Sequence, residues 1–219
     1  MKRYEDVDPD DSLGLCEFCY PSRSRTILYE DESVYLMPSL GQFVEGYLLL
    51  ISKQHRNCIA DVTDDHLESV KQTVANQLAE TYGSYCFFEH GQIGTCYQRA
   101  QSKICYHAHL HCLPVPVNFI SEVAEDFDSI SMSEFGELSA LKEEHPHYLF
   151  VETYDGEMGF FPVEDEIERQ YLRKQACEAL ELPKELADWK EYPNREKMKC
   201  TGRELEGEFS IPKAVGPAD

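Results

Sequence analysis

The stretch ICYHAHLHCLPVP, residues 104–116, places a histidine at every second position three times in succession. Single apolar residues separate His107, His109 and His111, and further apolar residues extend the alternation on either side. Side chains of a strand point to opposite faces in turn, so this pattern predicts a strand. One face of that strand is apolar, and the other carries three imidazoles in a row. The fold must therefore bury one side of the strand and give the histidines a role on the other.

Three interpretations fit such a row of histidines. The first is a hydrated strand, but three histidines at period two rarely arise by chance in a chain that has eight in all. The second is a metal site, although the β-carbons of residues i and i+2 on a strand lie about 6.5 to 7 Å apart. The third is a phosphate site in which one imidazole attacks phosphorus. Histidine suits this role because its pKa is near neutrality and it can form a covalent intermediate.

Charge and cysteine content limit the classes of function. The chain has 41 acidic and 20 basic residues, a net charge of −21, whereas a broad nucleic-acid surface needs clustered Lys and Arg. No stretch approaches the roughly 18 to 20 apolar residues of a membrane span, and the N-terminus MKRYEDVDPDDS lacks the apolar segment of a secretory signal. We therefore expect a cytoplasmic protein, in which nine cysteines indicate reduced thiols and a metal site rather than disulfides.

Hydrophobic periodicity elsewhere predicts a single α+β domain. The first helix has Thr63 as its predicted N-cap and Gly83 at its end. Strands are expected at 25–30, 33–37, 46–55 and 85–91, and a later hairpin over 148–163 is expected to turn on Asp155-Gly156. Helices are expected at 63–83, 120–143 and 165–182.

Cys16 and Cys19 form a C-x-x-C pair whose meaning is ambiguous on its own. A thioredoxin-like redox pair lies between a strand and a helix of a βαβ unit, a setting that the surrounding pattern does not indicate. A structural zinc site needs four ligands, and the chain has no second C-x-x-C. If the pair binds zinc, histidines must complete the site.

The segment HAHLHCLPV resembles the signature of the histidine triad (HIT) family, in which three histidines alternate with apolar residues. CEFC, ILYEDESVYLM, EGYLLLISKQH, the first helix and FEHG follow in the order of a HIT domain. The later segments YLFVET, QYLRK and DWKEYP are similar to the C-terminal extension of longer HIT-like proteins. The resemblance implies a HIT-like antiparallel sheet with flanking helices and a C-terminal helical and hairpin extension, often as a homodimer. The division that it implies is a mobile acidic N-terminus at 1–14, a HIT domain at 15–118, an extension packed on it at 119–200 and a polar tail at 201–219.

The resemblance also assigns roles to residues. His109 matches the nucleophile, which attacks the α-phosphorus of a nucleotide and forms a nucleotidyl-histidine, and His111 matches the residue that contacts the phosphate oxygens and the leaving group. In HIT proteins with the cysteine pair, the other two zinc ligands are the histidine that ends the third strand and the first histidine of the triad. These match His55 and His107, so the implied zinc ligands are Cys16, Cys19, His55 and His107. If this ligand set is wrong, Cys96 and Cys105 are the alternative ligands.

Several positions around the motif bear on substrate binding. Gln101, Ser102 and Lys103 precede the first histidine and are candidate phosphate donors, although the family usually places its Gln or Ser slightly nearer. Ser39 stands where the family often has an acidic ribose ligand, and Tyr47 stands where it has a histidine. The leading hypothesis is a nucleotide hydrolase or nucleotidyltransferase that acts on a phosphoanhydride or phosphoramidate. The alternative is a non-catalytic nucleotide-binding or protein-interaction module on the same scaffold.

Overall fold

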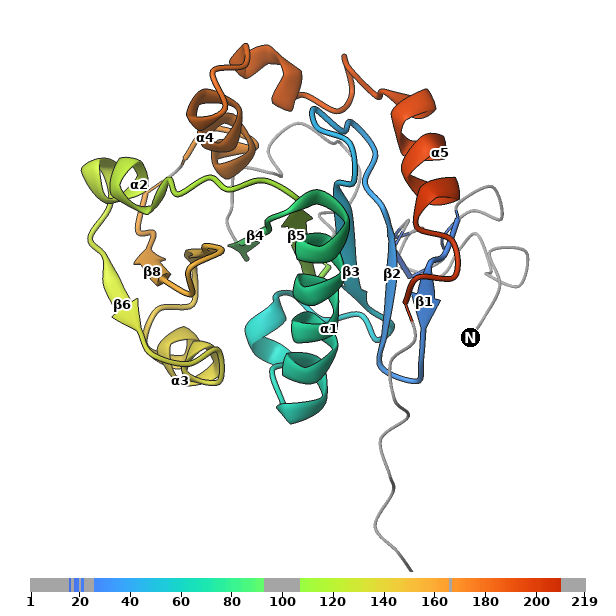
Figure 1. Cartoon of the computed structure of the whole chain (residues 1–219). Coiled ribbons are helices and arrows are strands. Elements are labelled where there is room, and N and C mark those ends of the chain that lie inside the picture. The colour runs from blue at the N-terminus through green and yellow to red at the C-terminus, as the bar shows by residue number, and fades with distance from the viewer. Residues whose placement is uncertain are drawn as a thin grey trace, which may run out of the picture.

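The computed structural model of the chain is built around one antiparallel sheet (Figure 1). The structure describes residues 16, 18, 19, 21, 26–92, 107–165 and 167–209. Within these residues eight strands pair in the order β1-β2-β3-β5-β4-β7-β8-β6, and every pair is antiparallel. The strands are β1 Tyr29–Glu30, β2 Val34–Pro38, β3 Leu48–Ser52, β4 Cys86–Gly91, β5 His109–Leu113, β6 Ile130–Met132, β7 Tyr148–Glu152 and β8 Met158–Pro162. The expected α+β class with an antiparallel sheet is confirmed.

Helices cover both faces of this sheet. The α-helices are α1 Asp65–Tyr82, α2 Ile120–Asp126, α3 Glu137–Glu144, α4 Tyr171–Ala179 and α5 Arg195–Glu204, and short 3₁₀ helices lie at η2 Ile59–Asp61 and η4 Lys184–Ala187. One core cluster joins α1 to the sheet through residues such as Leu50 and Phe87, and a second joins α4 to the opposite face through Leu49 and Phe88. Side chains of neighbouring positions on a strand thus supply two separate cores. The described helices include none that is both long and apolar enough to cross a membrane.

The N-cap of helix α1 lies one residue later than predicted. Asp64, not Thr63, is the N-cap, and its carboxylate accepts a hydrogen bond from the backbone N–H of Leu67. The hydroxyl of Thr63 instead donates to the carbonyl of Ile59, the first residue of the preceding 3₁₀ helix η2. A carboxylate at the N-cap also interacts favourably with the helix dipole. Gly83 ends the helix with a φ of 84°, as expected for a left-handed C-cap.

The C-terminal part continues the same sheet. Strand β7 pairs with β4 from Phe87 to Gly91, and the predicted hairpin β7–β8 turns at Gly156, whose φ is 84°. The expected helical region 120–143 is wrong in its middle, where β6 pairs with β8, because this short strand depends on a distant partner. The helix expected over 165–182 is limited to α4, and α5 was not expected at all and crosses the proposed boundary at residue 200.

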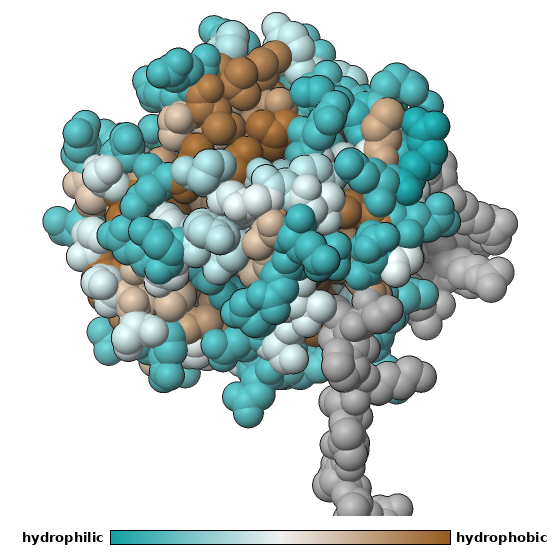
Figure 2. Space-filling model, in the orientation of Figure 1, coloured by the Kyte–Doolittle hydropathy of each residue, from teal (hydrophilic) through white to brown (hydrophobic). Residues whose placement is uncertain are grey.

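Hydrophilic side chains cover most of the face seen in Figure 2, as a net charge of −21 requires. An apolar area lies at the top of that view, beside α4 (Figures 1 and 2).

Candidate functional site

The histidine row lies in the middle of the sheet, on the face that α4 borders. Strand β5 pairs with β3 on one side and β4 on the other, which sets His111 opposite Leu49 and Phe88. The intervening residues Leu110 and Cys112 are buried in the core beneath α1. The predicted alternation of an apolar face with an imidazole face is confirmed for residues 108–112, and residues 104–106 lie outside the described part of the chain.

His109 is held in one tautomer by the backbone. Its Nδ1 lies 2.6 Å from the carbonyl oxygen of His107. A carbonyl can only accept a hydrogen bond, so Nδ1 carries the hydrogen and Nε2 carries the free lone pair. Burial lowers the pKa of His109 to about 4, which keeps the ring neutral near pH 7. The ring therefore offers an unprotonated nitrogen, the form that a nucleophile requires.

His111 is fixed differently, through a side chain. Its Nδ1 lies 2.6 Å from the hydroxyl oxygen of Tyr47, and its ring stacks on Phe88 with centroids 4.5 Å apart at an interplanar angle of 16°. Burial holds the pKa of His111 well below its usual value, and the positive charge of Arg173 adds to this effect. The centroids of the His109 and His111 rings lie 4.8 Å apart, so one small group can contact both.

The Nε2 atoms of both histidines remain available to a ligand. No group in the described part of the chain forms a hydrogen bond with the Nε2 of His109 or His111.

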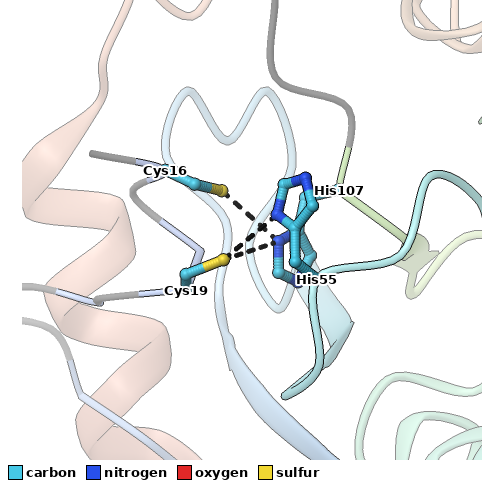
Figure 3. Close-up of side chains that lie close together, drawn as sticks. All are labelled: Cys16, Cys19, His55 and His107. Carbon is cyan, nitrogen blue, oxygen red and sulfur yellow. Dashed lines mark hydrogen bonds between the residues drawn. The ribbon is translucent and has the colours of Figure 1, made fainter. Parts of the chain in front are cut away.

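Four side chains meet next to this row and could hold a metal ion (Figure 3). The Sγ of Cys19 lies 3.1 Å from Nδ1 of His55 and 3.5 Å from Nδ1 of His107, and the Sγ of Cys16 lies 3.3 Å from Nδ1 of His107. All four ligand atoms lie within 4.8 Å of one another. A tetrahedral zinc with bonds of about 2.0–2.3 Å needs separations of roughly 3.3–3.8 Å, so small adjustments would complete the geometry.

The hydrogen-bond pattern of His107 also fits a metal ligand. Its Nε2 lies 2.6 Å from the carbonyl oxygen of Ser52 and therefore carries the hydrogen, which leaves the Nδ1 lone pair directed at the two thiols. A histidine ligand typically donates its other ring hydrogen to such an acceptor. The substitutes Cys96 and Cys105 lie outside the described residues.

Phe18, inside the C-x-x-C turn, connects the metal cluster with the histidine row. Its ring centroid lies 5.7 Å from that of His107 and 5.0 Å from that of His109. Its carbonyl accepts a hydrogen bond from the hydroxyl of Tyr35 on β2. The turn that carries the cysteines is thereby packed against His109.

Of the four predicted substrate-binding residues, the structure describes Ser39 alone. Ser39 is 2% exposed, and its hydroxyl donates to the carbonyl of Leu40. Gln101, Ser102 and Lys103 lie outside the described residues. Two residues of the FEHG segment, Glu89 and His90, have hydrogen-bond partners within the protein. Glu89 is buried on the α1 face, where it accepts hydrogen bonds from Ile59 N and the Tyr148 hydroxyl, and His90 accepts one from Leu172 N on the other face.

Arg173 is the main residue at this site that sequence reasoning missed. It comes from α4 and donates a hydrogen bond of 2.9 Å to the hydroxyl of Tyr47, which in turn contacts His111. Arg173 lies 126 positions from Tyr47 in the chain, so no local pattern connects the two. The segment QYLRK indicated a similarity of the extension but gave no role to its arginine.

A family model and several solved structures are similar to the chain. The sequence model described as "Scavenger mRNA decapping enzyme C-term binding" matches residues 12–122. No curated protein matches the chain. Among solved structures, a hypothetical histidine triad nucleotide-binding protein from Sulfolobus tokodaii is 17% identical, with a TM-score of 0.33, over 46% of this chain and 68% of its own.

Two further structures are similar to the chain. A HIT-like protein involved in cell-cycle regulation from Bartonella henselae is 18% identical, with a TM-score of 0.33, over 49% of this chain and 80% of its own. A DUF4931 family protein from Bacillus cereus is 14% identical, with a TM-score of 0.41, over 74% of this chain and 98% of its own. Because the family match spans just over half of the 219 residues and includes the cysteine pair and all three histidines, the chain belongs to the scavenger mRNA decapping enzyme C-terminal family of HIT-like proteins.

Proposed function

We propose that this protein is a nucleotide hydrolase or nucleotidyltransferase that acts on the α-phosphate of a nucleoside phosphoanhydride or phosphoramidate. The observation that carries the proposal is the tautomer of His109. Its Nδ1–H is bound to the backbone of its own strand, and its Nε2 lone pair has no protein partner among the described residues. A neutral imidazole held in one orientation is the form of histidine that can attack phosphorus.

The reaction would proceed in two displacements. His109 Nε2 attacks the α-phosphorus, the bond from phosphorus to the leaving group breaks, and the leaving group departs with the bonding electrons. The ring becomes cationic in the nucleotidyl-histidine, and the carbonyl of His107 stabilises that charge through Nδ1–H. Water or a second phosphate then attacks phosphorus and releases the neutral imidazole. His111, whose ring lies beside that of His109, would contact the phosphate oxygens and the leaving group.

Further contacts to the substrate are proposed from sequence. Gln101, Ser102 and Lys103, just before the histidine row, would donate to the phosphate. Ser39 would contact the ribose, which requires its hydroxyl to leave the carbonyl of Leu40. The family match to a scavenger decapping domain favours a nucleotide with a phosphoanhydride bond as the substrate.

We propose zinc as the metal of the Cys16, Cys19, His55 and His107 cluster. Two thiols and two imidazoles are a ligand set that zinc prefers, and four protein ligands indicate a structural rather than a catalytic ion. Bound there, zinc would tie the N-terminal turn to the strand that carries His109. Metal analysis of protein purified without added metal should give about one zinc per chain.

A pair of variants tests this zinc site. Cys16→Ser combined with Cys19→Ser should abolish the bound zinc, whereas Cys200→Ser, at an exposed cysteine of α5, should retain it. Unchanged zinc in the double variant would refute the ligand assignment.

The catalytic proposal is tested with a panel of dinucleoside polyphosphates and nucleoside phosphoramidates. The wild type should release a nucleoside monophosphate from at least one of them, and His109→Ala should lower turnover by orders of magnitude. His66→Ala is the matched control, because His66 bonds Asp31 away from the row. Tight nucleotide binding without turnover by the wild type would instead support the alternative, a binding module.

We also expect a homodimer from the family resemblance, and a cytoplasmic location from the cysteine content. β7 already occupies the outer edge of β4, so the free edges of the described sheet are those of β1 and β6. Light scattering at micromolar concentration should give about twice the 25.2 kDa chain mass, and the monomer mass would contradict this expectation.

A further inference from the structure

Arg173 carries a buried positive charge directly behind the histidine row. It is 3% exposed, and its donors go to three neutral acceptors: Nη1 to the Tyr47 hydroxyl at 2.9 Å, Nη2 to Gly41 O at 2.6 Å and Nε to Ala187 O at 2.9 Å. Its guanidinium also lies 5.2 Å from the ring centroids of Phe43 and Tyr47. No carboxylate of the described chain forms an ion pair with it. The site therefore keeps an uncompensated positive charge.

The hydrogen bond from Arg173 to Tyr47 determines the direction of the hydrogen bond between Tyr47 and His111. A guanidinium can only donate, so the Tyr47 oxygen accepts from it. Tyr47 is fully buried, and the one other partner of its hydroxyl in the described structure is Nδ1 of His111 at 2.6 Å. If His111 donated instead, the hydroxyl hydrogen of Tyr47 would be buried without an acceptor, which is strongly disfavoured. Tyr47 therefore donates to His111.

The ring hydrogen of His111 is therefore on the opposite nitrogen from that of His109. Since its Nδ1 accepts from Tyr47, the hydrogen of the neutral ring is on Nε2, and stacking on Phe88 fixes the ring plane. His109 has its hydrogen on Nδ1 and its lone pair on Nε2. The two neighbouring rings thus present one hydrogen-bond donor and one nucleophilic lone pair to the same space.

We propose that Tyr47, oriented by Arg173, is a positioning residue that fixes His111 as a hydrogen-bond donor to a phosphoryl oxygen. Helix α4 of the C-terminal extension thereby completes the phosphate side of the site. The uncompensated charge of Arg173 adds a field that favours an anionic group at that place. The Tyr47 hydroxyl donates to His111 because Arg173 already donates to its oxygen. The identity of the ligand as a phosphate rests on the proposed function.

The tautomer can be read without any substrate. Full-length protein labelled with ¹⁵N-histidine is examined by long-range proton–nitrogen correlation at neutral pH, and His111→Gln assigns the His111 signals. We expect a single form with hydrogen on Nε2 in the wild type. Tyr47→Phe and Arg173→Gln should convert it to an averaged mixture of both tautomers. Tyr171→Phe, which removes the bond from α4 to Asp126 but touches neither histidine, should leave the wild-type signals unchanged.

Several results would overturn the inference. A wild-type hydrogen on Nδ1 would do so without any variant, even if Tyr47→Phe does not fold. An unchanged tautomer in Tyr47→Phe, or an equal change in Tyr171→Phe, would do so as well. On a substrate that the wild type turns over, Tyr47→Phe should lower kcat on the order of 10- to 100-fold with a smaller change in KM, and an unchanged kcat would contradict the role. Absence of turnover in the wild type would count against the proposed function alone, because the tautomer is measured separately.

Discussion

A buried ion pair between Lys71 of α1 and Glu152 of β7 fastens the C-terminal extension to the N-terminal part. The two side chains are 6% and 8% exposed. The Lys71 ammonium also lies 4.6 Å from the ring centroid of Phe135 and 5.3 Å from that of Phe87. Lys71→Met keeps the apolar stem of the side chain and removes its charge. Glu152 is then a buried carboxylate without its cation.

The expected loss of stability follows from this burial. Removing one partner of a buried ion pair lowers the free energy of unfolding by about 3–5 kcal/mol, because the other charge remains desolvated. In a chain of this size each kcal/mol lowers Tm by about 2–4 °C, so we expect Lys71→Met to lower Tm by roughly 6–20 °C. Replacing both partners by apolar residues, Lys71→Met with Glu152→Leu, should restore most of that loss.

Differential scanning calorimetry of the wild type, the single variant and the double variant measures these changes. Lys199→Met is the matched control, because it breaks the exposed pair with Glu196 and should leave Tm unchanged. A loss in Lys71→Met no larger than in this control would contradict the expected cost of the unpaired Glu152. So would a double variant as unstable as the single one.

Two further predictions concern the α1 face of the sheet. Burial raises the pKa of Glu89 to about 8, so its carboxyl contributes stability that is full below the unfolded pKa of about 4.3 and is lost as the pH rises through 8. In urea unfolding from pH 5 to 8, the wild type should lose up to ~1.4 kcal/mol per pH unit relative to Glu89→Gln, and parallel curves would contradict this. Gly91→Ala would place a methyl group 2.2 Å from the buried ring of Tyr148, and calorimetry should show a loss of about 1–3 kcal/mol. Gly136→Ala, whose methyl group would meet nothing within 4 Å, should not lower Tm.

The parts of the fold that could be predicted from sequence are those with local signals. Alternation at period two assigns Leu110 and His111 to opposite faces whatever lies around them. The C-x-x-C spacing and the family resemblance brought together Cys16, Cys19, His55 and His107, which the structure places in one cluster. The hairpin at Asp155-Gly156 was predictable because its turn needs a glycine with positive φ.

The parts that could not be predicted depend on distant partners. Strand β6 exists because it pairs with β8, and its three residues carry no strand signal strong enough to outweigh the surrounding helical pattern. Helix α5 has few buried residues, so its apolar stripe is weak. Arg173 acts through carbonyls and a hydroxyl spread along the chain, and a lone arginine in a helix usually indicates only a solvated face.

Attack by His109 on the α-phosphorus can be detected by trapping the covalent adduct that it forms. The protein is mixed with a substrate from the panel, quenched within the first turnover, digested under conditions that preserve phosphoramidate bonds, and analysed by mass spectrometry. We expect a nucleotidyl adduct on the peptide that carries His109, present in the wild type and absent in His109→Ala. Substrate turnover by His109→Ala at the wild-type rate, or an adduct located on another residue, would contradict it.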